Sequence, residues 1–180
     1  MESITGYNAI PDTGEYTKLP AGGYVIKITD VKDVPEKQYL RIIYDIAEGP
    51  ERGRYKNEDP DHDYRHSFVR SYKEKALGMF KAFIKAVDAA NETNFDEFIE
   101  KGFDEKHLKG CRLGVLFGYE EYEANDGTVK ERLRLAGFKT IEQIRAGDFS
   151  VPSTRRLSET ISTSGPVPGF TPINEADVPF

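Results

Sequence analysis

The alternation of apolar and polar residues predicts strands in the first half of the chain. Tyr24–Val31 and Tyr39–Ile46 are rich in β-branched residues, and a turn at Val34–Gln38 separates them. In the second strand, alternate residues from Leu40 onward form an apolar face that we expect to pack in the core. A third strand pattern covers Tyr64–Arg70. The folded part of the chain is therefore expected to begin with three strands.

A long strand and a returning strand are predicted in the second half of the chain. The long strand runs over about Cys111–Glu123, and the returning strand covers Val129–Phe138. Between them, Asn125-Asp126-Gly127 is a typical signal of a hairpin turn. In the returning strand, the alternation places Leu133 and Leu135 inward. The opposite face then carries three cations, Lys130, Arg132 and Arg134.

Helical spacing begins after the third predicted strand. Ser71, with Glu74 three residues later, has the form of a capping box. Apolar residues then recur at the spacing of one helical face until about Ala90. These residues are Leu77, Phe80, Ile84 and Val87. A shorter helix is predicted within Phe95–Phe103, and one or two helical turns are predicted within Thr140–Ala146.

The predicted order is three strands, one helix and two strands. An oligonucleotide/oligosaccharide-binding (OB) barrel has this order, and its helix plugs one end of the barrel. We therefore expect a mainly β fold with one principal helix, built as a five-stranded OB-type barrel over residues 21–149. Residues 1–20 have the composition of an irregular arm. Residues 150–180 are rich in Ser, Thr, Pro and Gly, which is typical of a flexible tail.

Composition narrows the range of functions. The 180 residues include 38% hydrophobic residues and carry a formal net charge of −6. Such a chain can bury a core, but it cannot coat duplex DNA through bulk positive charge. Cys111 is the single cysteine, which excludes an internal disulfide and fits a reducing compartment. Since no membrane-span or signal-peptide pattern is found, we expect a soluble, cytoplasmic protein without a membrane partner.

Aromatic residues interleaved with cations are the main candidate chemistry. Proteins that bind single strands combine a cationic groove along the phosphates with flat rings that stack on unpaired bases. Rings and cations lie next to each other on several predicted strands, and Tyr122 is expected opposite Lys130 across the hairpin. The candidate nucleic-acid-binding residues are Tyr39, Arg41, Arg52, Arg54, Tyr55, Lys56, Arg65, Phe68, Arg70, Tyr72, Lys73, Tyr122, Lys130, Arg132 and Arg134.

The segment Arg52–Lys56 has two interpretations. Its three cations alternate with Gly53 and Tyr55, so an extended backbone would place all three on one side. Such a row suits contacts with phosphate groups. It is equally typical of a solvated edge strand that charge protects from aggregation.

Metal sites receive little support from the spacing of their candidate ligands. Asp59, Asp61 and Asp63 alternate as in a calcium loop, but Tyr64 and Arg70 stand where such a loop needs Gly and Glu. Four potential zinc ligands lack the paired CxxC motif that typical zinc sites contain. They are His62, His66, His107 and Cys111. We therefore expect no bound metal.

Enzymatic function is weakly indicated. Glu120, Glu121 and Glu123 suit a carboxylate metal site of a nuclease, although an exposed acidic face is the commoner explanation of such a cluster. The chain has no GxxxxGK[ST], GxGxxG or GxSxG motif, so nucleotide hydrolysis, dinucleotide binding and acyl transfer lack their usual signals. We therefore expect no cofactor and no catalytic residue.

The C-terminal tip has the form of a partner-binding segment. Phe180 combines an apolar ring, which suits a pocket on a partner, with the terminal carboxylate. The acidic residues before it suit a basic rim around such a pocket. The candidate partner-binding residues are Glu175, Asp177, Val178, Pro179 and Phe180.

The last four residues, Asp177-Val178-Pro179-Phe180, resemble the end of bacterial and phage single-stranded DNA-binding proteins. In that family a run of acidic residues precedes an aliphatic residue, Pro and Phe. The resemblance covers the tail, where Ala176 makes the acidic run thinner, and the absence of Trp departs from many bacterial members. It implies an OB fold that binds single-stranded DNA without marked sequence preference and recruits replication, recombination and repair proteins through its tip.

The sequence therefore favours a non-enzymatic single-stranded DNA-binding protein of a phage or bacterial system, in the host cytoplasm if phage-encoded. Two alternatives stay open. One is a metal-dependent nuclease or other DNA-processing enzyme that uses the acidic clusters. The other is an OB-like protein-interaction module without nucleic-acid binding, which the negative charge favours. Homo-oligomerisation also stays open.

Overall fold

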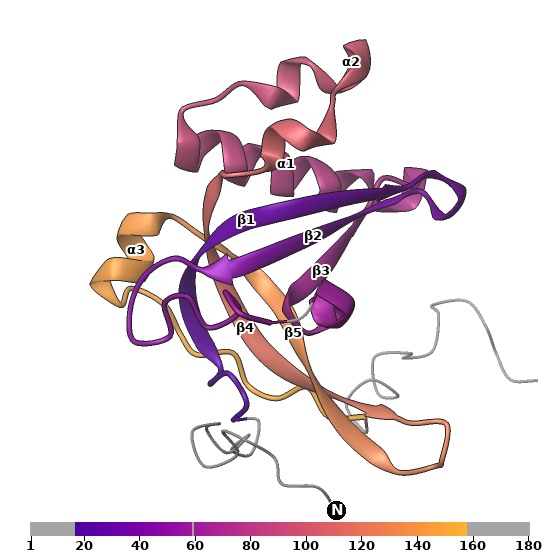
Figure 1. Ribbon diagram of the computed structural model, residues 1–180, viewed down its shortest axis with the longest axis vertical. Helices are drawn as coiled ribbons and strands as arrows, with labels where there is room; N and C mark the ends of the chain where they lie inside the picture. Colours follow the sequence, from indigo (N-terminus) through magenta and orange to yellow (C-terminus); the bar gives the residue numbers. More distant parts are fainter. Residues whose placement is uncertain (1–16, 59, 158–180) are drawn as a thin grey trace, which may run out of the picture.

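Five antiparallel strands dominate the described part of the protein. The computed structural model describes residues 17–58 and 60–157, and within them the sheet has the order β3-β2-β1-β4-β5 (Figure 1). The strands are β1 (Gly22–Val34), β2 (Tyr39–Ile46), β3 (Ser67–Ser71), β4 (Arg112–Glu123) and β5 (Val129–Lys139). The main helix, α1 (Leu77–Asn91), follows β3. The mainly β fold, with its principal helix between the third and fourth strands, is confirmed.

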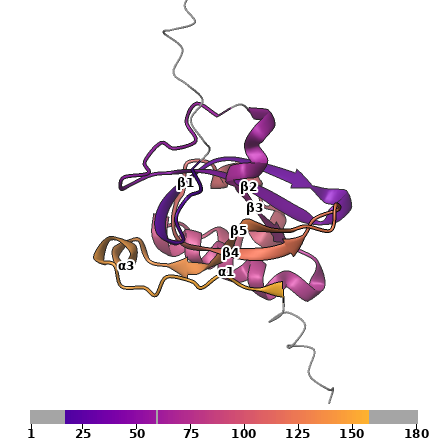
Figure 2. The same ribbon diagram turned by 90° about the horizontal axis from the view of Figure 1, so that it is seen from below.

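The strand β1 joins the two halves of the sheet. Its first part pairs with β4 from Gly22 to Lys27, and its second part pairs with β2 from Ile26 to Val34. A β-bulge after Ile28 interrupts the second ladder. Bulges bend a strand and increase its twist. Figure 2 shows, from below, that the whole sheet is strongly curved.

The core lies between the inner face of the curved sheet and α1. The inward positions of β4 are almost fully buried, as the alternation predicts: Leu113, Val115 and Phe117. α1 contributes four buried side chains, Phe80, Phe83, Ile84 and Val87. The ring centroid of Phe83 lies 6.0 Å from that of Phe68 in β3 and 6.0 Å from that of Phe138 in β5. Since one helical side chain reaches both edge strands, α1 covers the place where they approach each other.

The sheet is not closed into a hydrogen-bonded barrel. Closure requires a ladder between the edge strands β3 and β5, and the strands that the structure describes form none. β3 is short because Pro60–His66, which includes the predicted strand start at Tyr64, forms 3-10 turns instead. We call the gap between β3 and β5, bounded by Phe68 and Phe138, the β3–β5 seam.

The predicted start of the main helix is wrong. Ser71 is the last residue of β3, and its hydroxyl donates to the carbonyl of Gln38 at 3.1 Å instead of capping a helix. A 3-10 turn at Glu74–Ala76 comes first, and α1 begins at Leu77, whose side chain is half-exposed. Ser71 therefore bonds to Gln38 in the turn before β2 and does not cap a helix, although the local sequence has the form of a capping box.

A capping box is present at the last helix instead. α3 (Ile141–Ala146) begins after Thr140, whose hydroxyl accepts from the backbone N–H of Gln143 at 3.1 Å. The side-chain carbonyl of Gln143 accepts from the backbone N–H of Thr140 at 3.1 Å in return. Both bonds satisfy donors that a helix start leaves unpaired.

The segment predicted as a short helix within Phe95–Phe103 is divided. It forms a 3-10 turn at Phe95–Glu97 and then α2 (Ile99–Gly102). Its start is held by Asp88 of α1, whose carboxylate accepts from the backbone N–H of Phe95 at 2.8 Å. None of the helices within residues 17–58 and 60–157 is long and apolar enough to span a membrane.

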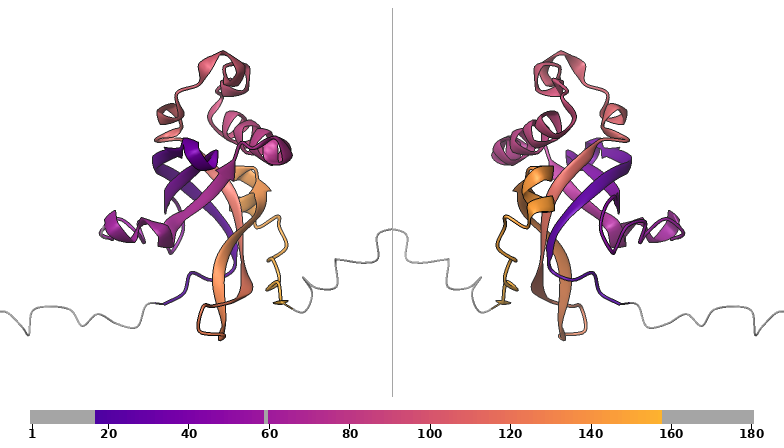
Figure 3. Two further views of the ribbon diagram at one scale, coloured as in Figure 1. Left: turned by 90° about the vertical axis from the view of Figure 1, so that its right-hand side faces the viewer. Right: turned by 90° about the vertical axis from the view of Figure 1, so that its left-hand side faces the viewer.

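The first residues of the predicted tail are attached to the sheet. Arg155 forms a parallel bridge with Glu120 of β4, and its backbone N–H donates to the carbonyl of Tyr119 at 2.9 Å. Pro152 lies against Gly118, where an added Cβ would stand only 2.9 Å from the proline Cβ. Figure 3 shows this segment running beside β4 after α3. We call residues 150–157 the docked segment, since they pair where β1 no longer covers β4.

Candidate nucleic-acid interface

The outer face of β1, β2 and β3 carries one of two candidate contact surfaces. Tyr39 and Arg41 point away from the core because Leu40 between them is buried. Lys32 of β1 lies directly opposite Arg41 in the ladder. We call Lys32, Tyr39 and Arg41 the outer strand face. Lys32 was missed because the sequence pattern predicted that the first strand ends at Val31.

An internal carboxylate already occupies the cations of the outer strand face. Asp63, in the 3-10 segment, places one oxygen 2.5 Å from Lys32 Nζ and the other 3.5 Å from Arg41 Nη1. The hydrogen bond from Lys32 is the main reason that the pKa of Asp63 lies below its ordinary value. A phosphate that reaches this face would therefore have to compete with Asp63.

The β4–β5 hairpin carries the second candidate surface. The register places Tyr122 opposite Lys130 and Glu120 opposite Arg132, so the predicted cross-strand pair is confirmed. The guanidinium carbon of Arg132 lies 5.3 Å from the centroid of the Tyr122 ring, and its Nε donates to Glu120 at 2.7 Å. We call Tyr122, Lys130 and Arg132 the hairpin platform. It combines a half-buried ring with two exposed cations.

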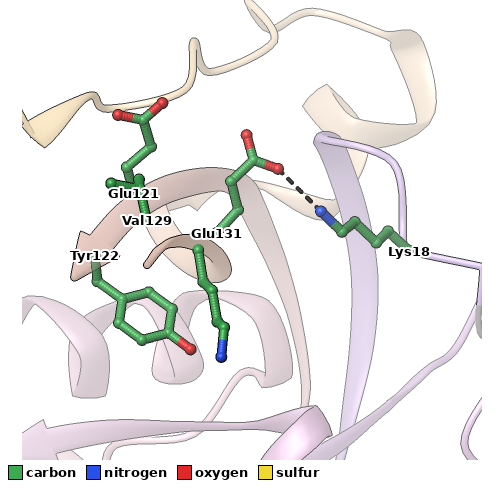
Figure 4. A pocket seen from close by; sticks show the side chains of 6 residues that line it. Lys18, Glu121, Tyr122, Val129 and Glu131 are labelled. Carbon is green, nitrogen blue, oxygen red and sulfur yellow. Dashed lines mark hydrogen bonds and ion pairs between the residues drawn. The ribbon is translucent and has the colours of Figure 1, made fainter. Parts of the chain in front are cut away.

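A shallow hollow adjoins the hairpin platform (Figure 4). Its volume is about 570 Å³, and it is lined by Lys18, Glu121, Tyr122, Val129, Lys130 and Glu131. Lys18 Nζ lies 3.0 Å from a Glu131 oxygen, and Figure 4 shows Glu121 and Tyr122 pointing to different sides of the hairpin. Positive and negative groups alternate around the hollow. The hollow itself therefore does not suit a long polyanion, whereas the exposed cations of the hairpin platform suit individual phosphate groups.

The predicted row of cations at Arg52–Lys56 is not present. The backbone is a series of turns, in which the N–H of Lys56 donates to the carbonyl of Gly53 at 3.1 Å. Gly53 has a φ of 73°, a left-handed conformation that breaks an extended run. Arg54 pairs with Glu51 at 2.5 Å. Arg52 and Lys56 remain exposed cations without the alternation that would align them.

Two of the predicted stacking rings belong to the core. Tyr55 is 5% exposed, and its ring stacks on His66 with centroids 4.8 Å apart. Phe68 is 9% exposed and packs against Tyr44, with centroids 5.9 Å apart. Neither ring offers a free face to a base, so neither is part of the candidate interface.

The other predicted residues lie in varied surroundings. Arg65 pairs with Glu58 at 3.0 Å, and the hydroxyl of Tyr72 donates to Asp33 at 2.9 Å. Lys73 is exposed after β3. Two arginines on the edge strands are half-buried, and each has an Nε that is buried without a hydrogen-bond partner. They are Arg70 and Arg134.

The metal-ligand candidates do not come together. Across residues 17–58 and 60–157, no three side chains of His, Cys, Asp or Glu are grouped so that they could hold a metal ion. Glu120 is bound by Arg132, and Glu121 accepts from the backbone N–H of Leu157 at 3.2 Å. These two contacts give Glu120 and Glu121 a structural role.

The partner-binding candidates Glu175, Asp177, Val178, Pro179 and Phe180 lie outside the described residues. The comparisons with known proteins assign no family: no protein-family model matches the chain. No curated protein matches it either.

Proposed function

We propose that this protein binds single-stranded DNA with little sequence preference and does not act as an enzyme. The observation that carries the proposal is the hairpin platform, on which Tyr122 lies beside two cations in a fixed register. Base stacking on an aromatic ring contributes about 1–3 kcal/mol per base and tolerates any base, because every base has a π-face. Cations beside the ring hold the phosphates that flank the stacked base.

The arrangement of strands supports an OB-type fold for this proposal. OB folds are five-stranded, partly open barrels that bind oligonucleotides on the face of strands 2 and 3 and on the loops 1–2 and 4–5. The outer strand face lies on β1 and β2, and the hairpin platform lies on β4 and β5. In Figure 1 the β1–β2 and β4–β5 turns both project toward the right-hand side. Both candidate surfaces are therefore on elements that this class uses for binding.

Internal acids tune the affinity of the proposed interface. Arg41 pairs with Asp63, Lys130 with Asp126, and Arg132 with Glu120. An incoming phosphate has to replace these carboxylates, and the net charge of −6 adds a long-range repulsion. We expect binding that weakens as salt rises, with a slope that the screening of this repulsion makes shallower.

The tail completes the proposal as a means of recruiting proteins of replication, recombination and repair. Phe180 and its terminal carboxylate would enter an apolar pocket with a basic rim on the partner. A pull-down from host lysate tests this part: wild type should capture partners that Phe180→Ala and a C-terminally extended chain lose. Retention of the same partners by all three proteins would remove the tip from the proposal.

Fluorescence anisotropy with labelled oligonucleotides tests the DNA-binding part. The protein should bind a single strand much more tightly than the duplex of the same sequence. If about four cations contact phosphates, log K should fall with log salt at a slope near −3, from about 0.7 per contact. Stronger binding to duplex, or a slope near zero, would contradict the proposal.

The same titration in divalent metal separates the alternatives. Binding without cleavage supports the proposal, and metal-dependent cleavage would identify a nuclease. The absence of both would favour a protein-interaction module.

A further inference from the structure

Arg70 occupies an unusual position in the β3–β5 seam. It lies two residues after Phe68 on β3, so both side chains are on the same face of the strand. Its guanidinium carbon is 5.1 Å from the ring centroid of Phe68 and 5.2 Å from that of Phe138 on β5. The cation therefore lies between two rings that belong to edge strands without a common ladder.

The hydrogen-bonding capacity of Arg70 is largely unused among the residues that the structure describes. A guanidinium has five N–H donors. Nη1 donates to the carbonyl of Val69 at 3.2 Å, whereas Nε is buried without a partner. Within residues 17–58 and 60–157, no carboxylate forms an ion pair with Arg70. The two rings offset part of the desolvation through cation–π attraction, but they cannot accept all the donors.

Three other cations of the candidate interface have an acidic partner, which Arg70 lacks among the described residues. Arg41, Lys130 and Arg132 each lie within 4.0 Å of an acidic oxygen. Burial lowers the pKa of Arg70 to about 10, and no neighbouring acid opposes this effect. Buried arginines are rare unless they are paired. Among the described residues, Arg70 is therefore a half-buried guanidinium without an acidic partner.

We propose that the β3–β5 seam binds one phosphate group, with the guanidinium of Arg70 as its ligand. This inference rests on the proposed function, in which that group is a phosphodiester of the single strand. The planar fork can donate two parallel bonds to phosphate oxygens, and the flanking rings fix its orientation. A phosphate at this site would not have to displace an internal acid, unlike one at Arg41 or Arg132.

Nuclear magnetic resonance of the arginine Nε–H groups in the full chain tests the site. We expect the Arg70 resonance to shift saturably when either an oligothymidylate or inorganic phosphate is added. The oligothymidylate should act at much lower concentration, since a phosphodiester chain also reaches the other surfaces. Saturation by inorganic phosphate at equal or lower concentration would identify a free-phosphate site instead of a DNA contact. No shift with either ligand would overturn the inference.

The variant Arg70→Met supplies an independent measurement. It should weaken oligonucleotide binding at least about tenfold, because bonds to a charged group are lost, and reduce the salt slope by about 0.7. Its melting temperature should stay equal or rise, because it removes a desolvated charge. Arg70→Lys keeps the charge without the fork and should bind with intermediate affinity. Lys106→Met, which removes an exposed cation outside the interface, should bind as wild type does.

The outcomes separate this inference from the proposed function. If wild type binds DNA but Arg70→Met binds equally well with an unchanged slope, Arg70 is structural and the proposed function stands. If wild type binds no DNA, the proposed function fails, and the phosphate titration decides the seam site by itself. Should Arg70→Met fail to fold, Arg70→Lys and the wild-type resonance still give a decisive result.

Discussion

The loop of residues 52–68 and the strand β5 show how differently one sequence pattern can fold. Both place cations next to apolar residues. In β5 the ladder with β4 turns Lys130 and Arg132 outward, while Leu133 packs against the core. Around Tyr55 turns replace the ladder and its ring is buried, whereas Phe68 is buried at the start of β3, where it pairs with Ile42 of β2. Alternation predicts the direction of a side chain only where a neighbouring strand fixes the backbone.

This contrast predicts that replacing an aromatic residue changes the free energy of unfolding by different amounts in the two regions. Phe68→Ala should destabilise the fold by about 3–5 kcal/mol, because it removes a buried ring that Tyr44 and Phe83 contact. Tyr122→Ala should change the free energy of unfolding by less than about 1 kcal/mol, since its ring lies on the hairpin platform. Urea denaturation measures both. Equal losses would mean that the hairpin platform is part of the core.

DNA binding should show the opposite order. Tyr122→Ala should weaken oligonucleotide binding by about 1–3 kcal/mol, or roughly 5- to 150-fold, if one base stacks on the ring. Tyr122→Phe keeps the ring and serves as the matched control, so it should bind nearly as wild type does. Anisotropy titrations at one salt concentration measure the effect. A similar loss in Tyr122→Phe would show that the hydroxyl, and not stacking, makes the contact.

Removing the internal acid should strengthen binding at the outer strand face. Asp63→Asn frees Lys32 and Arg41, which the carboxylate now holds. We expect several-fold tighter binding at low salt and a salt slope that is steeper by about 0.7–1.4, for one or two added phosphate contacts. Titrations at four salt concentrations give the slope. An unchanged slope would exclude the outer strand face from the interface.

The carboxylate of Asp63 should make the free energy of unfolding depend on pH. The pKa of Asp63 is lowered in the folded state, mainly by the Lys32 hydrogen bond, so its contribution is complete above the ordinary value of 3.8. It is lost as the pH falls through the lowered folded value. Wild type should therefore be more stable than Asp63→Asn near neutral pH, and the difference should shrink below 3.8. A difference that stays constant into acid would contradict this account.

The smallest effect is expected where the docked segment meets the hairpin. Gly118→Ala places a Cβ only 2.9 Å from the Cβ of Pro152, so the docked segment should shift. The amide of Arg155, which donates to Tyr119, should exchange faster with solvent, while global stability falls by less than about 1 kcal/mol. Hydrogen exchange measures this. Unchanged protection of Arg155 would mean that the segment adapts without leaving β4.

The fold could be predicted from the sequence wherever long-range pairing and local pattern agree. The bounds of β2, the β4–β5 hairpin and the inward residues of β4 follow from alternation and a turn signal. The start of α1 could not be predicted, because Ser71 bonds to Gln38, which is distant in sequence. The docked segment left no signal, since backbone groups make its main contacts.

The candidate site could be predicted less completely than the fold. The hairpin platform follows from alternation, and its register is as expected. Lys32 was missed at the end of a strand that is longer than the pattern indicates. In the sequence, Asp63 belongs to a spacing like that of a calcium loop. In the structure, its carboxylate instead pairs with Lys32 and Arg41 on other elements. The ion pairs of Asp63 with Lys32 and Arg41 cannot be deduced from the residues next to Asp63 in the sequence.

The two candidate surfaces are linked through a very short piece of chain. Ile26 and Lys27 of β1 pair with both β2 and β4, and the other paired residues of β1 have one neighbour or the other. This overlap and the bulge after it bend β1, and the bend sets the angle between the outer strand face and the hairpin platform. An inserted or deleted residue there would shift the register by one and turn the following side chains of β1, Lys32 included, to the opposite face of the sheet. The relative orientation of the two candidate surfaces is therefore set by the geometry of a single strand.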